Sequence, residues 1–242
     1  MKAPLTALGR SLRELCFPAV CLLCQTGLPA FSAVHLCPAC RAGIRVIEPP
    51  LCQCCGVEFS GAGDSHYCGP CLASPPHFSR ARAIFRYDDG SAKLVHAFKY
   101  GGKTVGRATF CALAQEVVPL ADLSPPELII PVPLHAKRLK ERGFNQALVL
   151  ARILFPKERQ RIAPRLLVRT RWTEPQTALS GRERRQNLGG AFAIRQPERI
   201  YGRQILLVDD VFTTGTTLNE CAKVLKAHGA VRVEALTLAR VE

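Results

Sequence analysis

The sequence predicts an α/β domain, built on a mostly parallel sheet with helices on both faces, preceded by a small cysteine-rich module. Ten of the twelve cysteines fall before residue 72, so the first third of the chain is stabilised differently from the rest. After residue 77, apolar runs of strand length alternate with helical patterns, which is typical of a parallel sheet covered by helices. A composition of 48% hydrophobic and 21% charged residues allows a buried core.

The stretch Ala73-Ser-Pro-Pro-His77 has the composition of a linker between two units. We therefore expect one unit over residues 1–76 and another over residues 77–242, with separate cores. In the second unit we expect a βα alternation. Strands are predicted at 83–87, 127–132, 166–170, 191–194, 204–208 and 231–238, and helices at 91–99, 105–118, 145–154 and 218–228, the last ended by Gly229.

The N-terminus does not have the pattern of an export signal. Arg10, Arg13 and Glu14 interrupt the apolar run, and the leucines between residues 5 and 15 recur at helical spacing instead. No stretch approaches the roughly 20 apolar residues that span a bilayer. We therefore expect a soluble, cytoplasmic protein without a membrane span. In that reducing compartment, paired cysteines are more often metal ligands than disulfides.

Eight cysteines form two copies of one pattern, CxxC, twelve residues, CxxC, offset by 31 residues at all four positions. Two such pairs supply the four tetrahedral ligands of one Zn²⁺. Four thiolates leave no open position for a substrate, so we predict two structural zinc sites. Pairing within each copy is simplest. Interleaved pairing, replacement of a ligand by His35 or His66, and disulfide or redox use are alternatives. The predicted ligands are Cys21, Cys24, Cys37, Cys40, Cys52, Cys55, Cys68 and Cys71.

The most informative stretch is the buried strand expected at 204–208 and the turn after it. Asp209 and Asp210 follow the strand, where their carboxylates can accept hydrogen bonds from sugar hydroxyls. A hydroxyl-rich turn then opens a helix whose free N–H groups and positive dipole end favour phosphate. We predict a ribose-phosphate site formed by Asp209, Asp210, Val211, Phe212, Thr213, Thr214, Gly215, Thr216 and Thr217.

Most of the net charge of +14 lies between Leu134 and Asn187, which contain 14 Lys and Arg against 4 Glu. This excess indicates substrate phosphates or a nucleic-acid backbone as partner, with a solvated basic surface as the alternative. Residues 171–187 read as a mobile loop that closes over substrate, or as a disordered surface excursion. Candidate pyrophosphate ligands are Lys137, Arg138, Lys140 and Arg142 after a strand end, and Arg184 in the basic stretch.

The run from Ile205 to Thr217 resembles the phosphoribosyl pyrophosphate (PRPP) signature of type I phosphoribosyltransferases. The resemblance implies that Asp209 and Asp210 bind the ribose hydroxyls and that the Thr213–Thr217 turn encloses the 5-phosphate, with Mg²⁺ bound alongside PRPP. It also places the segment after residue 131 where the family has its pyrophosphate loop. Thr213 stands where many purine-type members carry an Asp that contacts the base, so purine salvage is disfavoured.

With the cysteine module, Phe98-Lys-Tyr-Gly-Gly102, Arg142-Gly-Phe-Asn-Gln146, and Gln176 with Arg184 and Asn187, the chain resembles the ComF family over nearly its whole length. This resemblance implies a double zinc ribbon joined to a type I phosphoribosyltransferase-like fold. It further implies a role in handling single-stranded DNA during natural transformation, with a DNA-uptake helicase or other competence proteins as possible partners.

The sequence does not decide whether the chain catalyses a reaction. The alternative function is an active Mg²⁺-dependent phosphoribosyltransferase with an unknown acceptor, in which Asp209 and Asp210 would be catalytic, but no general base is identifiable. For binding of single-stranded DNA, the candidates to stack on bases are Tyr100, Phe144 and Trp172.

Overall fold

The computed structural model describes residues 19–29, 32, 34–61, 63–100, 109, 112–113, 122–172 and 189–241, with only the backbone at 97–100. The helix expected near the N-terminus, most of the helix expected at 105–118, and residues 173–188 with Arg184 lie outside the described residues. In the part of the chain that is described, no helix is long and apolar enough to cross a membrane.

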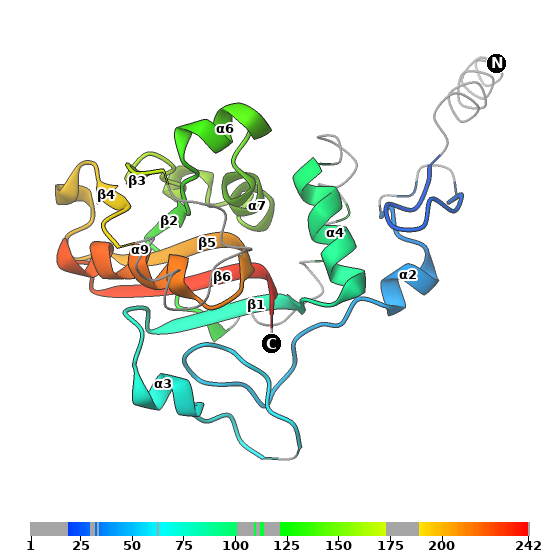
Figure 1. Cartoon of the computed structure of the whole chain (residues 1–242), viewed down its shortest axis with the longest axis horizontal. Coiled ribbons are helices and arrows are strands. Elements are labelled where there is room, and N and C mark those ends of the chain that lie inside the picture. The colour runs from blue at the N-terminus through cyan, green and yellow to red at the C-terminus, as the bar shows by residue number, and fades with distance from the viewer. Residues whose placement is uncertain are drawn as a thin grey trace, which may run out of the picture.

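A parallel four-stranded sheet forms the centre of the fold (Figure 1). Its strand order is β1-β6-β5-β2, and each neighbouring pair runs parallel, so the predicted sheet class is confirmed. The two middle strands are rich in Val, Ile, Leu and Ala because both of their faces are covered. The strands span Arg80–Arg86 (β1), Leu128–Pro131 (β2), Gln204–Phe212 (β5) and Arg232–Arg240 (β6).

Helices cover both faces of this sheet (Figure 1). Successive strand residues point to opposite faces, so Ile205 and Leu207 of β5 pack toward α9, whereas Leu206 packs toward α4 and α7. As predicted, Gly229 follows the last helix, with a positive φ of 84°. The helices span Asp89–Tyr100 (α4), Gln146–Leu154 (α7) and Thr216–Ala227 (α9).

A smaller antiparallel pair, β3 (Leu167–Arg169) with β4 (Phe192–Ile194), lies beside α9 at positions where short strands were predicted. Short 3₁₀ turns at Arg159–Arg161 and Pro197–Arg199 complete this part of the chain.

The expected pyrophosphate loop contains a helix, α6 (Ala136–Arg142). The side chain of His135 accepts a hydrogen bond from the backbone N–H of Lys137 and so caps the start of α6. Gly143, with a φ of 74°, ends it.

The cysteine module lies along the outer edge of β1. The N–H of Ile47 donates to the carbonyl of Ile84 at 3.1 Å, and the N–H of Ala81 donates to the carbonyl of Cys54 at 2.6 Å. These bonds use backbone groups of an edge strand that would otherwise be open to pairing with another chain. The module therefore completes the sheet as well as preceding it.

The expectation of two separate cores is wrong. Cys52 and Cys71 belong to the same buried cluster as Phe212 on the α9 face, and Cys21 packs in the cluster that contains Leu94 on the other face. A small unit with few apolar side chains of its own gains burial by packing on the neighbouring sheet. The boundary at residues 76 and 77 remains a prediction about organisation, but the two parts share their cores.

This packing explains a difference between the two cysteine repeats. Gly56 has a φ of +70°, and a Cβ there would lie 2.6 Å from the backbone oxygen of Ala81 in β1. Gln25, which is 31 residues earlier, has a similar φ of 61° and carries a side chain. The glycine is therefore required by the close approach of β1 and not by the cysteine turn itself.

Candidate ligand site and metal centres

The two cysteine repeats fold alike, so the sequence offset reappears in the backbone hydrogen bonds. The N–H of Cys21 donates to the carbonyl of Thr26 at 2.8 Å, and the N–H of Cys52 donates to the carbonyl of Val57 at the same distance. Each bond closes the tight turn that carries the first CxxC pair of its repeat. The second pair begins a short helix in both repeats, α2 (Pro38–Ala42) and α3 (Gly69–Ala73).

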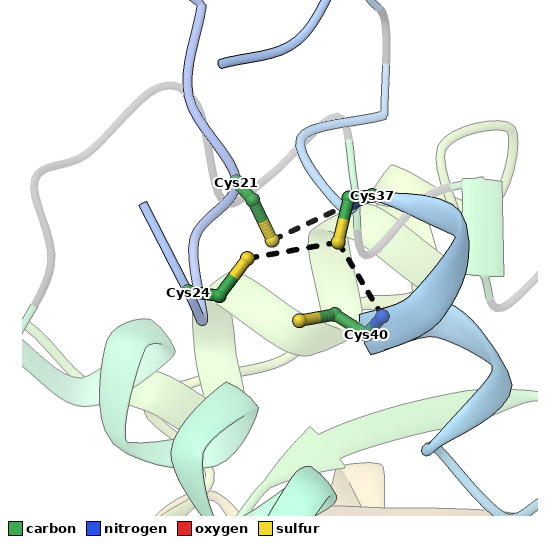
Figure 2. A group of neighbouring side chains, drawn as sticks. All are labelled: Cys21, Cys24, Cys37 and Cys40. Carbon is green, nitrogen blue, oxygen red and sulfur yellow. Dashed lines mark hydrogen bonds between the residues drawn. The ribbon is translucent and has the colours of Figure 1, made fainter. Parts of the chain in front are cut away.

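The sulfurs of each repeat converge on one point, as Figure 2 shows for the first repeat. The Sγ atoms of Cys24 and Cys37 are 3.6 Å apart, and those of Cys55 and Cys68 are 3.7 Å apart. Four thiolates around a tetrahedral Zn²⁺ at about 2.3 Å would be separated by about 3.8 Å. The donors therefore fit two structural zinc sites. Pairing is within repeats: Cys21, Cys24, Cys37 and Cys40 form the first cluster, and Cys52, Cys55, Cys68 and Cys71 the second.

Thiol electrostatics in the second cluster favour a bound cation. Burial acts to raise the pKa of Cys52, but hydrogen bonds from the backbone N–H groups of Cys68 and Cys55 outweigh it and lower that pKa to about 6. Burial raises the pKa of Cys55 to about 11. Because neighbouring thiolates repel each other, a cation between them would stabilise the deprotonated form of the cluster.

The other candidate ligands near these clusters make different contacts. The ring of His66 stacks on Phe59 at 3.9 Å, and its Nδ1 lies 3.0 Å from the carbonyl of Asp64. Cys54 is buried and points its sulfur at the carbonyl of Phe78. Among the described residues, only the two sets of four cysteines gather closely enough to hold a metal, so neither His66 nor His35 replaces a ligand.

The predicted ribose-phosphate segment begins inside a strand. β5 continues past residue 208, through Asp209 and Asp210, because Val211 and Phe212 keep pairing with β6. Each carboxylate accepts a hydrogen bond from the N–H of the next residue, at 2.9 Å and 2.8 Å. Both acids are half-buried at the carboxyl end of a middle strand, where open α/β sheets bind ligands.

The turn after β5 leads into the N-terminus of α9. Gly215, with a φ of 72°, is the cap residue of α9, which begins at Thr216 rather than at the predicted Leu218. A glycine cap has no side chain with which to bond the first N–H groups of the helix. The hydroxyl oxygens of Thr214 and Thr216 lie 2.8 Å apart beside them. N–H groups at a helix start, with hydroxyls nearby, suit a phosphate.

A cavity of about 270 Å³, here called the ligand cavity, opens beside these residues. Asp209 and Asp210 contribute its two carboxylates. Three guanidinium groups also line it: Arg138 and Arg142 from α6 and Arg169 from β3. This balance leaves a positive excess that favours an anionic ligand. Of the predicted residues, those lining the ligand cavity are Asp209, Asp210, Val211, Thr213, Thr217, Arg138 and Arg142.

Thr213 also lines a second cavity, and the other predicted site residues that the structure describes lie outside the ligand cavity. The second cavity, of about 340 Å³ and here called the back cavity, lies between the turn and the second cysteine cluster. Lys137 is exposed, with its ammonium nitrogen 4.8 Å from the ring centroid of Trp172, and Lys140 is also exposed. Arg184 lies outside the described residues. The predicted residues that line the back cavity are Phe212, Thr213, Thr214, Gly215 and Thr216.

Comparison with known proteins matches both parts of the chain. The double zinc ribbon domain family matches residues 12–72, and the phosphoribosyl transferase domain family matches residues 142–242. The DNA utilization protein YhgH of Escherichia coli O6:H1 is 35% identical over 231 residues, which cover 93% of this chain and 99% of that protein. Competence protein F of Haemophilus influenzae is 34% identical over 230 residues, covering 91% and 96%. The chain belongs to the ComF family.

A more distant ComF relative is competence protein ComFC of Bacillus subtilis, 28% identical over 226 residues, which cover 91% of this chain and 84% of that protein. The solved structure of a purine phosphoribosyltransferase from Pyrococcus horikoshii is 17% identical, with a TM-score of 0.31 over 55% of this chain and 81% of that one, and adds nothing to the assignment.

The ComF motif at residues 142–146 has structural roles that sequence reasoning did not assign. Asn145 joins β2 to α7, because its Nδ2 donates to the carbonyl of Val132 at 3.0 Å while its Oδ1 accepts from the N–H of Ala147 at 2.9 Å. Gln146 is only 2% exposed and lines the ligand cavity. Its amide nitrogen has no hydrogen-bond partner among the described residues. A ligand oxygen in the cavity would remove the cost of that buried donor.

Arg169 is the cationic residue that sequence reasoning missed in this ComF site. Burial and the neighbouring charge of Arg138 lower its pKa, while Asp209 acts in the opposite direction. The only signal in the sequence was an arginine within a short apolar strand. Strand alternation implied that the side chains of Arg169 and Val168 point to opposite faces of β3. It did not imply that the face of Arg169 is the one that meets Asp209.

Proposed function

We propose that this ComF-family chain binds PRPP with Mg²⁺ in the ligand cavity and single-stranded DNA beside it, and that it acts in the cytoplasm in DNA uptake. One observation carries the proposal of PRPP binding. Two carboxylates at a strand end, the N–H groups at the start of α9 and three guanidinium groups line or adjoin one cavity. The proposal of a role in DNA uptake is supported by the names of relatives, which are DNA utilization and competence proteins. A DNA-uptake helicase or another competence protein is a proposed partner.

The chemistry of PRPP fits each part of this cavity. Asp209 and Asp210 would accept hydrogen bonds from ribose hydroxyls, and the turn, which reaches this cavity at Thr213 and Thr217, would hold the 5-phosphate. Arg138 and Arg142 would pair with the pyrophosphate oxygens. The carboxylate oxygens are donors of the kind that Mg²⁺ prefers, and the ion would neutralise part of the pyrophosphate charge.

Titration calorimetry of the whole chain with PRPP tests this assignment. We expect one saturable site per chain with Mg²⁺ present. Binding should be weaker when EDTA removes the ion, because the negative charge of the pyrophosphate group is then less neutralised. Ribose 5-phosphate and inorganic pyrophosphate, each of which fills part of the site, should compete. Absence of saturable binding at millimolar PRPP would overturn the assignment.

A cationic aromatic group that adjoins the ligand cavity through Arg138 supports binding of single-stranded DNA. The rings of His135 and Trp172 lie 5.2 Å apart, edge to face. The charged ends of Lys137 and Arg138 lie 4.8 Å and 5.7 Å from the Trp172 centroid. Arg138 also lines the cavity, so this group adjoins it. Aromatic rings beside cationic side chains bind bases and backbone of a single strand without strong sequence preference.

We expect the chain to bind a fluorescein-labelled oligothymidylate, with log affinity falling by about 0.7 per contacted phosphate for each unit of log salt, or about 3.5 for roughly five contacts. Trp172→Ala should weaken binding by roughly tenfold with an unchanged salt slope, because it removes stacking. Lys137→Gln should reduce the slope, because it removes a phosphate contact. Fluorescence anisotropy across a salt series measures both quantities.

Lys223→Gln is the matched control for that experiment, since it removes an exposed lysine on α9, outside the basic segment. It should change neither quantity. PRPP should lower DNA affinity, because both ligands use Arg138. A flat salt response would contradict backbone binding, and independence of the two ligands would place DNA elsewhere, on the cysteine module.

Phosphoribosyl transfer to an unidentified acceptor is the second candidate function. It is favoured by the positions of Arg138 and Arg142, which line the same cavity as the carboxylates and would stabilise departing pyrophosphate. In such a step the bond from C1 to pyrophosphate breaks as the acceptor forms its bond to C1. Release of pyrophosphate from PRPP in the presence of nucleobases or oligonucleotides tests it.

A further inference from the structure

The turn that follows β5 has little packed protein behind it. The back cavity, of about 340 Å³, separates the turn from the second cysteine cluster. Thr213 and Thr214 line it on one side, and Cys71 and the Ser74–Pro76 stretch line it on the other. Both threonines are exposed. The position of the turn therefore depends on the few side chains that support it.

Phe212 is the side chain beneath the turn. A Cβ added to Gly215 would lie 2.5 Å from the ring atom Cζ of Phe212, so the ring sits directly against that glycine. The ring is 5% exposed and packs edge to face on Phe78, with centroids 6.2 Å apart. Any shift of the Phe212 ring would move Gly215, and with it the start of α9.

Arg240 joins Phe212 to the second cluster. It lies opposite Phe212 in the β5–β6 register, and its guanidinium carbon is 4.2 Å from the ring centroid. Nη1 donates to the carbonyl oxygen of Cys55 at 2.8 Å, and Nη2 donates to its Sγ at 3.6 Å. A guanidinium bonded to a metal-ligating thiolate restrains both the ligand and its own position.

We propose that the second zinc site positions the phosphate-binding turn through Arg240 and Phe212, and that the first site does not. Zinc would fix the Cys55 turn, Arg240 transmits that position to Phe212, and Phe212 supports Gly215. The first cluster instead packs with Leu94 of α4 on the other face of the sheet. Two repeats of one spacing thus have different roles. The consequence for PRPP affinity rests on the function proposed above.

Arg240→Met tests this connection, because it keeps much of the side-chain volume but removes the donors to Cys55. We expect two bound zinc ions by elemental analysis, about tenfold weaker PRPP binding by calorimetry, and faster amide hydrogen exchange at residues 212–219. Arg240→Lys can still donate to the Cys55 carbonyl, so it should recover part of the PRPP affinity and part of the protection from exchange. It also takes the place of Arg240→Met in the test if that variant does not fold. Arg232→Met, an exposed position on the same strand, should change neither.

Coupling between the sites must be reciprocal. PRPP should therefore raise the affinity of the chain for one of the two zinc ions, measured by equilibrium competition with a chromogenic chelator, and Arg240→Met should abolish that increase. Wild-type exchange and PRPP affinity in Arg240→Met would overturn the proposal. If the wild-type chain does not bind PRPP, the proposed function fails, while faster exchange at residues 212–219 in Arg240→Met would still establish the structural connection.

Discussion

Cys52→Ser is expected to remove about one zinc ion per chain and to abolish cooperative folding of the central sheet, not only of the cysteine module. Structural zinc contributes about 10–16 kcal/mol in isolated zinc-binding peptides, which matches or exceeds the net stability of about 5–15 kcal/mol of a typical domain. Cys52 and Cys71 are buried in one cluster with Phe212. Loss of the metal would therefore open the core behind β5 and β6. Elemental analysis and calorimetric melting measure the two effects.

The matched control is Cys24→Ser in the first cluster. Cys24 is exposed, whereas Cys52 is fully buried. This variant should also lose about one zinc ion, but the central sheet should still melt in one cooperative transition. Equal loss of cooperativity in both variants would contradict the unequal docking of the two clusters. Retention of two tightly bound ions in either variant would contradict its ligand assignment.

The double variant Asp209→Asn with Asp210→Asn is expected to abolish stabilisation by PRPP. A ligand at 100 times its Kd stabilises the folded state by about 2.7 kcal/mol, or about 5–10 °C in melting temperature for a domain of this size. Asparagine keeps the shape and the oxygen that accepts the next N–H, so the fold should be retained. It removes the charge and half of the acceptors that ribose hydroxyls would use. Thermal melting with and without PRPP and Mg²⁺ measures the loss.

Two comparisons make this result specific. A charge-matched control, Asp64→Asn with Glu198→Gln, changes two exposed acids and should leave the PRPP effect intact. Inorganic pyrophosphate without Mg²⁺ should bind the Asp209 and Asp210 variant at least as well as wild type, because the cavity becomes more positive. Equal stabilisation of variant and wild type by PRPP would refute the role assigned to the two acids.

Much of the site could be predicted from local sequence. The 31-residue offset and the CxxC spacing identified all eight clustered cysteines, because a metal site needs ligands at short, regular separations. The run from Asp209 to Thr217 was located from a buried strand followed by a small, hydroxyl-rich turn. Its element boundaries were wrong, since β5 continues to Phe212 and α9 begins at Thr216. Pairing with β6 extends the strand, and that pairing cannot be read from β5 alone.

The sequence by itself thus determined the sheet class, the two cysteine clusters and the position of the turn, because these depend on spacing along one stretch of chain. Only the tertiary structure decided how the two parts combine. Ala81 bonds to Cys54, Arg240 bonds to Cys55 across 185 residues of sequence separation, and Arg169 reaches the cavity of Asp209. Such contacts depend on which surfaces meet when the sheet closes, and no local pattern encodes that. The shared core and the third arginine are therefore properties of the folded chain.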